Sequence, residues 1–189
     1  MKAKVAILKV TKRFMVGSQA IECLDLGPIK VKLMDTEEGE GWSVEQVNAV
    51  EKWYKRFLFL NLKHPSAAIV PNKIIDVFWH YHILDTMKYP EDCQKVFGYF
   101  LHHFPYFGMR SEKDASDLKK AFTETKDMFF VEFGESLSEL LKVFPINETG
   151  TSFASENSAR CGVRCVNPSC KSPKCGKKST DLSRPVFVG

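Results

Sequence analysis

Ionisable side chains are unusually dense between residues 75 and 93, where the chain reads IDVFWHYHILDTMKYPEDC. Asp76 and His80 are four residues apart, and His82 and Asp85 are three apart. On a helix, residues at either spacing share a face and can touch. A carboxylate beside an imidazole fixes the tautomer of the ring and raises its basicity, as around metal ions and in general-base pairs. The segment therefore predicts a polar site built into apolar surroundings.

The two histidines of this segment are expected to point in different directions. Because successive residues of a helix turn by about 100°, His80 and His82 lie about 200° apart. They cannot both bind one ion if the helix is regular. We therefore predict one site at Asp76 and His80 and a separate one at His82 and Asp85.

A metal ion would need a further ligand from another element. His103 is expected at the edge of the buried face of the next helix, where it can meet His80. Two histidines and a carboxylate, His80, His103 and Asp76, would suit zinc or iron. Asp92 or Cys93 could supply an additional ligand.

Three uses of this cluster stay open from the residues alone. The pairs can be satisfied polar groups that hold helices in register through hydrogen bonds. They can bind a metal ion. They can also form a metal-dependent enzyme in which His80 and His103 hold the ion and the His82 and Asp85 pair acts as general base. A different class of function is an adaptor that binds a protein partner through the aromatic residues 104–107, since functional contacts concentrate on loops.

The motif D-x-x-W-H-x-H-x-L-D-x-x-x-Y-x-x-D-C runs from Asp76 to Cys93 and is followed by FGYFLHHFPYFG at residues 97–108. Together they resemble the glycine-rich domain-containing protein-like family, over residues 43–134. The resemblance implies a helical domain and no particular reaction. It also implies that the following residues belong to a shared pattern: Asp76, Trp79, His80, His82, Asp85, Tyr89, Asp92, Cys93 and His103.

The elements that must position these side chains are predicted to be helices. Ser43 and Gln46 form a capping-box signature, and apolar residues then recur at helical spacing over 44–62. A second helix is expected from Pro71 to Lys88; it is apolar on almost every side, which predicts burial at the centre of a bundle. Further helices are expected over 90–104, from Ser111 to a C-cap at Gly134, and over 135–144.

The remainder of the chain is expected to be organised differently. Residues 4–10 and 27–34 have β-like character, so that 1–42 forms an extended N-terminal arm or a small hairpin. Residues 43–145 are the helical domain, and 146–160 are a polar linker. The fold class predicted is thus a mostly α, compact bundle with an extended or β-like arm and a disordered, cysteine-containing tail at 161–189.

Four of the six cysteines lie in this tail: Cys161, Cys165, Cys170 and Cys175. Their spacing is wider than the two-residue knuckles of common zinc sites, so a Cys₄ zinc site and a tail of reactive thiols both stay open. After residue 160 there are six Lys or Arg and one Asp, which leaves 21 basic and 22 acidic residues before it. A nucleic-acid footprint is therefore not indicated on the folded part, although the basic tail could contact RNA.

The composition is that of an ordinary globular protein, with 44% hydrophobic and 26% charged residues in 189. No apolar run approaches the roughly 20 residues that span a bilayer, and lysines interrupt the N-terminal apolar stretch. We therefore expect a cytoplasmic protein that does not enter a membrane.

Overall fold

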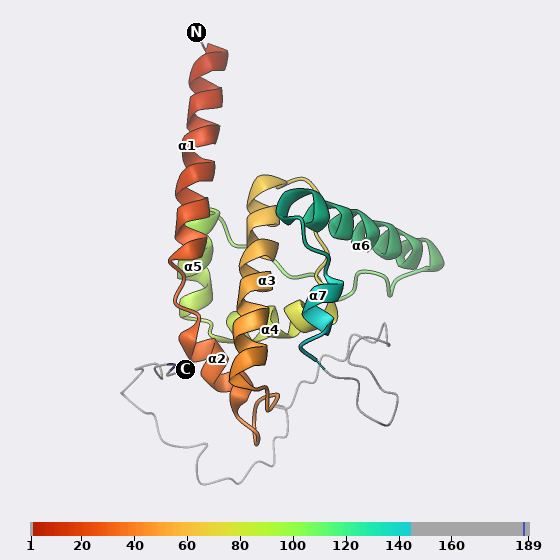
Figure 1. Ribbon diagram of the computed structural model, residues 1–189. Helices are drawn as coiled ribbons and strands as arrows, with labels where there is room; N and C mark the ends of the chain where they lie inside the picture. The colour runs from red at the N-terminus through yellow and green to blue at the C-terminus, as the bar shows by residue number, and fades with distance from the viewer. Residues whose placement is uncertain (1, 145–186, 188–189) are drawn as a thin grey trace, which may run out of the picture.

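The part of the chain that the computed structural model describes, residues 2–144 and 187, contains helices and no strands. The helices, in chain order, are α1 Lys2–Glu22, α2 Gly27–Met34, α3 Val44–Lys63, α4 Lys73–Leu84, α5 Lys88–Val96, α6 Glu112–Phe133 and α7 Ser138–Leu141. They form a compact bundle from which the N-terminal part of α1 projects (Figure 1). The mostly helical fold class is therefore confirmed for these residues.

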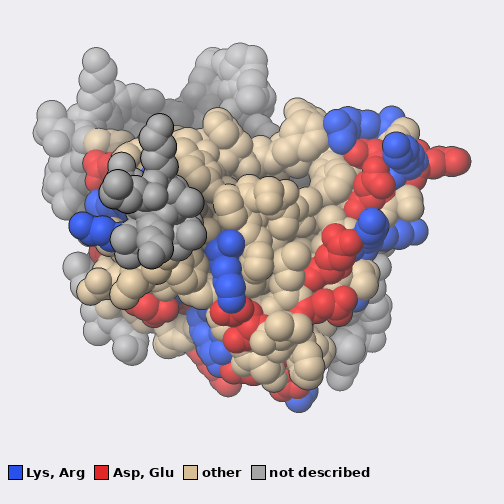
Figure 2. All heavy atoms as spheres, turned by 90° about the horizontal axis from the view of Figure 1, so that it is seen from above, with Lys and Arg blue, Asp and Glu red and all other residues tan. Residues whose placement is uncertain are grey.

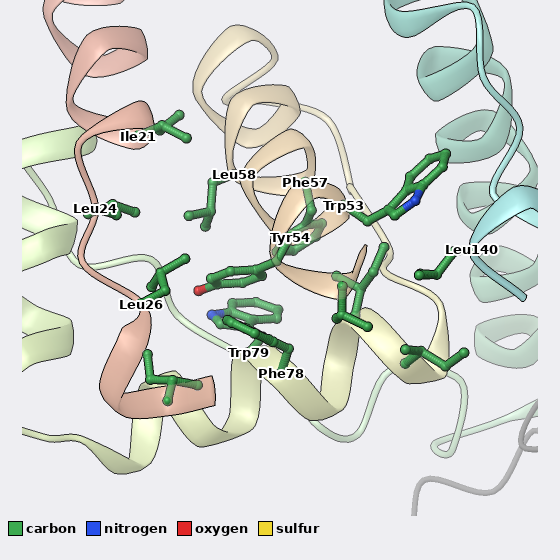
Figure 3. Close-up of a cluster of buried hydrophobic side chains, with 14 of the residues drawn as sticks. Ile21, Leu24, Leu26, Trp53, Tyr54, Phe57, Leu58, Phe78, Trp79 and Leu140 are labelled. Atoms are coloured by element: carbon green, nitrogen blue, oxygen red, sulfur yellow. The ribbon is translucent and has the colours of Figure 1, made fainter. Parts of the chain in front are cut away.

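Helix α3 is the element around which the others are arranged. It packs against α1, α2, α4, α6 and α7, and Figure 1 shows it running between α1 and α6. The predicted capping box is present, because Ser43 accepts a hydrogen bond from the Gln46 N–H and the Gln46 side chain accepts one from the Ser43 N–H. Its aromatic residues meet those of α4: the Tyr54 and Phe78 ring centroids are 4.9 Å apart (Figure 3). Seven of its residues are buried: Val47, Val50, Trp53, Tyr54, Phe57, Leu58 and Leu60.

The β-like character predicted for residues 4–10 and 27–34 is wrong, because both segments are helical. In α2 the side chain of Lys30 lies on the buried face, and its ammonium forms an ion pair of 2.7 Å with Glu51. A lysine can bury its aliphatic stem and leave its charge paired, so Lys30 can lie on the buried face of a helix. Helix α1 approaches α5 closely at Gly17, where a Cβ atom would lie 2.4 Å from the Val96 carbonyl oxygen.

Helix α4 is shorter than predicted. It was predicted to begin at Pro71, but it begins at Lys73, and Asn72 is its N-cap. The Asn72 side chain accepts a hydrogen bond from the Ile75 N–H at 2.9 Å. The helix ends at Leu84, which is 72% exposed. Trp79 is buried, as expected from the apolarity of the helix, but the end of α4 reaches the surface.

The predicted helix over 90–104 is wrong in its second half. Helix α5 ends at Val96, and Gly98 adopts a φ of 68° while its N–H donates to the carbonyls of Cys93 and Gln94. Only glycine adopts this left-handed conformation at little cost, so the chain leaves the helix there. His103 consequently lies on a segment without regular secondary structure.

The C-terminal helices agree with their sequence signals. The Ser111 side chain caps α6 by accepting from the Asp114 N–H, and Gly134 ends it with a φ of 66°. Helix α7 falls within the predicted range 135–144. The predictions for the linker and for the four tail cysteines lie outside the described residues.

Among the described helices, none combines the length and the apolarity needed to cross a bilayer. Acidic and basic side chains are interspersed over the face seen in Figure 2. On the part of that face that is drawn in colour, lysine and arginine side chains are separated by acidic and other residues.

Candidate functional site

Helix α4 brings Asp76 and His80 onto one face. Their separation of four residues places the side chains one turn apart, and the distance from His80 Nε2 to Asp76 Oδ2 is 3.6 Å. The predicted proximity of these two side chains is therefore confirmed. Both are half-buried, with 35% of the His80 and 29% of the Asp76 side chain exposed.

His103 joins this pair from the segment that follows α5. Its Nε2 lies 3.1 Å from Asp76 Oδ1 and 3.1 Å from His80 Nε2. One ligand atom from each of the three side chains lies within 4.8 Å of the others. The structure therefore brings together the histidines and the carboxylate that the sequence placed in one set.

The electrostatics of the group favour a neutral imidazole at His80. Burial lowers the pKa of His80, the neighbouring His103 lowers it further, and Asp76 opposes both effects. Two Nε2 atoms at 3.1 Å can share a hydrogen bond only when one carries the proton and the other accepts it. Neutral imidazole is the form that binds a metal ion, so a neutral ring does not first have to release the extra proton of the charged form.

The distances within the group suit a small cation. Two ligand atoms about 2.1 Å from one ion are roughly 3.0 Å apart in octahedral and about 3.4 Å apart in tetrahedral geometry. His103 Nε2 lies 3.1 Å from both His80 Nε2 and Asp76 Oδ1, and His80 Nε2 lies 3.6 Å from the other oxygen, Asp76 Oδ2, so the observed separations are close to these values. Two histidines and a carboxylate also form the ligand set of non-haem iron sites and of several catalytic zinc sites.

Cys93 and Asp92, which the sequence offered as additional ligands, do not belong to this group. Cys93 is 3% exposed, and its thiol interacts with Tyr89 and the Leu101 backbone. Burial raises the pKa of this thiol, which disfavours the thiolate that metals bind. Asp92 is likewise buried, beside His82.

His82 belongs to a separate, interior network. Its Nδ1 lies 2.8 Å from the Tyr54 hydroxyl, and its Nε2 lies 3.2 Å from Asp92 Oδ2. Burial lowers the pKa of His82, although Asp92 opposes this effect. We infer a neutral ring that donates from Nε2 to Asp92 and accepts from Tyr54 at Nδ1. The predicted separation of the two histidines is confirmed.

Both ring nitrogens of His82 are engaged by residues other than Asp85. Helix α4 ends one residue before Asp85, whose carboxylate accepts a hydrogen bond from the Lys88 N–H at 3.2 Å. His82 is also only 1% exposed. The structure thus places the predicted general-base histidine in the interior, hydrogen-bonded to Asp92 and Tyr54.

Sequence reasoning missed Tyr54 and Lys88 as members of this interior network. Lys88 Nζ lies 2.7 Å from Asp92 Oδ2. The spacing of Lys88 and Asp92 is a recognisable helical ion-pair signal. Tyr54 gave a weaker signal, since a tyrosine on the buried face of a helix usually needs a partner for its hydroxyl.

The aromatic segment proposed as a partner surface is partly exposed. Phe104 is 54% and Tyr106 is 60% exposed, and the Arg110 guanidinium lies 5.0 Å from the centre of the Phe104 ring. Partner binding by residues 104–107 stays a prediction.

A family model described as UCP032817-like matches residues 21–129, which is more than half of the chain. The matched range includes all three members of the Asp76, His80 and His103 group. No curated protein and no solved structure matches the chain.

Proposed function

For this chain, which belongs to the UCP032817-like family, we propose a helical metal-binding domain whose ligands are Asp76, His80 and His103. The observation that carries the proposal is the convergence of three ligand atoms from two segments far apart in the sequence. Surface carboxylates often cluster without a metal, but two imidazoles facing the same carboxylate are the ligand types that zinc and iron prefer. The resemblance to the glycine-rich domain-containing protein-like family supports the proposal, because the three residues all lie in the shared pattern.

The number of ligands indicates what kind of site this would be. Structural zinc sites use four protein ligands, whereas catalytic zinc sites use three and leave a position for water or substrate. Non-haem iron sites with two histidines and a carboxylate also keep open positions. The residues suit zinc and iron equally in type, so the proposal names both.

A metal-dependent enzyme is the second function that an observation favours. The three side chains are 18–35% exposed, so that a small molecule can reach an ion held between them. A cavity of about 440 Å³ that is lined by residues of α1, α3 and α6 includes none of the three residues.

Metal content and thermal stability of the full chain test the proposal. The protein is purified without chelator, its zinc and iron are measured by elemental analysis, and its melting is followed with and without added Zn²⁺. An ion at about 100 times its Kd stabilises the native state by about 2.7 kcal/mol, which raises Tm by roughly 5–10 °C for a chain of this size. His80→Ala should abolish both the bound metal and the Zn²⁺-dependent rise.

Two further variants make the result specific. His102→Ala removes an exposed histidine next to His103 and should leave metal binding unchanged. Truncation after Gly150 removes the four tail cysteines and should also leave the metal in place. The proposal is contradicted if the full chain binds no metal. It is also contradicted if truncation removes the metal while the His80→Ala variant keeps it.

A further inference from the structure

Of the three proposed ligands Asp76, His80 and His103, His103 alone does not lie on a helix. Residues 101–104 have no regular secondary structure, so no ladder of backbone hydrogen bonds fixes their conformation. A ligand must nevertheless be held close to its binding geometry before the ion arrives, or ordering it lowers the affinity. Other contacts must therefore hold His103 toward α4.

The peptide group of Leu101, two residues before His103, is held by two side chains of α5. The Tyr89 hydroxyl donates a hydrogen bond of 2.5 Å to the Leu101 carbonyl oxygen. The Leu101 backbone also lies beside the Cys93 thiol and lowers its pKa, against the larger effect of burial. Tyr89 is 1% exposed and Cys93 is 3% exposed, so water does not compete with either contact.

Trp79 connects this anchor to the histidine itself. Its indole N–H donates to the Tyr89 hydroxyl oxygen at 2.9 Å, and its ring meets the His103 ring edge to face with centroids 4.7 Å apart. The Tyr89 oxygen thus accepts from Trp79 while it donates to Leu101. Trp79 lies one residue before the ligand His80, so the same turn of α4 holds one ligand and supports another.

From these contacts we propose that Trp79, Tyr89 and Cys93 are positioning residues that hold the Leu101–His103 segment and so direct His103 toward Asp76 and His80. The inference deepens the proposed function and rests on it for its consequence for metal affinity. It also assigns a role to three residues of the sequence motif that have no place among the ligands.

Tyr89→Phe tests this arrangement with a small change, since it removes one hydroxyl and keeps the buried ring. Tyr54→Phe is the matched control: it also removes a buried hydroxyl with a hydrogen bond, to His82, but it does not touch the Leu101–His103 segment. Cys93→Ala is a second test of the same segment and replaces Tyr89→Phe if that variant does not fold.

The first readout needs no metal. In the native protein the Trp79 ring should displace the NMR signals of the His103 ring protons, and the amides of residues 101–103 should exchange slowly. Tyr89→Phe should reduce the displacement and speed the exchange, whereas Tyr54→Phe should do neither. This readout decides the positioning role even if the chain binds no metal, in which case only the proposed function fails.

The second readout is affinity for Co²⁺, whose visible absorption reports the geometry around the ion. Substitution of residues that support metal ligands typically weakens affinity 10–100-fold, and we expect about tenfold for Tyr89→Phe and no change for Tyr54→Phe. The inference is overturned if Tyr89→Phe leaves the NMR signals of His103 unchanged. It is also overturned if Tyr89→Phe releases His103 but leaves the affinity for Co²⁺ unchanged.

Discussion

Replacing Asp92 with Ala is expected to destabilise the folded bundle strongly. The Asp92 side chain is 4% exposed, and its Oδ2 lies 3.2 Å from His82 Nε2 and 2.7 Å from Lys88 Nζ. Burial opposes ionisation of Asp92, but hydrogen bonds from His82 and Lys88 outweigh it and keep the pKa of the carboxyl below its usual range. The carboxylate is therefore charged at neutral pH and has partners on two helices.

Two separate losses set the size of the effect. Removing one partner of a buried ion pair costs about 3–5 kcal/mol, because the other charge stays buried without compensation. Here that charge is the ammonium of Lys88, whose side chain is 11% exposed and can move only partly into water. The His82 N–H also loses its acceptor, which alone costs about 1–3 kcal/mol. Because these losses overlap, we expect a total of about 3–5 kcal/mol.

A double variant separates the effect of leaving the Lys88 ammonium without its partner from the effect of the packing lost with the Asp92 side chain. Lys88→Met removes the ammonium, so Asp92→Ala with Lys88→Met should be more stable than Asp92→Ala alone, by about 1–3 kcal/mol. Urea unfolding at pH 7, followed by circular dichroism, measures all three variants. Glu91→Ala is the control: its side chain is 72% exposed, and the change should stay within about 0.5 kcal/mol.

The reasoning about this network is refuted by either of two results. A loss below about 1 kcal/mol for Asp92→Ala would mean that the ion pair contributes as little as a surface pair. A double variant less stable than Asp92→Ala would mean that Lys88 stabilises the fold through its packing and not through its charge.

Three further predictions concern pH and the helix ends. Burial is the main cause of the lowered pKa of both His80 and His82, so the unfolded chain takes up protons near pH 6.5 while the folded chain resists; stability should therefore fall as the pH drops below about 6.5. Equal urea midpoints at pH 7.5 and 5.5 would contradict this. Gly134→Ala should cost about 1 kcal/mol, since φ is 66° and nothing lies within 4 Å of the new Cβ. Gly98→Ala should cost a similar amount in the same unfolding assay, since φ is 68° and the Arg13 guanidinium, 2.2 Å from the new Cβ, is the end of an exposed, flexible side chain that can move away; a clearly larger loss than for Gly134→Ala would show that Arg13 is held in place.

Local signals in the sequence were sufficient for several helix boundaries and for half of the site. Ser43 and Ser111 as N-caps and Gly134 as a C-cap act within one turn of their own position, so their residue types predict the boundaries. The pairing of Asp76 with His80 is also local, since it follows from a separation of four residues on a regular helix. Signals of this kind need no knowledge of the rest of the fold.

Patterns that depend on a neighbouring element misled the prediction. A helix was predicted over 90–104, but it ends at Val96, and Phe100 is 41% and Phe104 is 54% exposed in the segment that follows Gly98. Residues 27–34 were predicted to have β-like character, but they form α2, in which Lys30 is buried against Glu51 of α3. In both places the sequence recorded which side chains are apolar or charged, and the neighbouring helix decided which of them are buried.

The sequence by itself determined which residues of this protein are available for chemistry, and the tertiary structure decided how they are combined. His82 lies three residues before Asp85 in the sequence, yet its hydrogen-bond partners are Asp92 and Tyr54, because α4 ends at Leu84 and the chain folds α5 and α3 against it. His103 reaches Asp76 and His80 from an irregular segment rather than from a helix face. Spacing along one helix is set by its own geometry, whereas the approach of a segment to that helix depends on packing and hydrogen bonds between residues far apart in the chain.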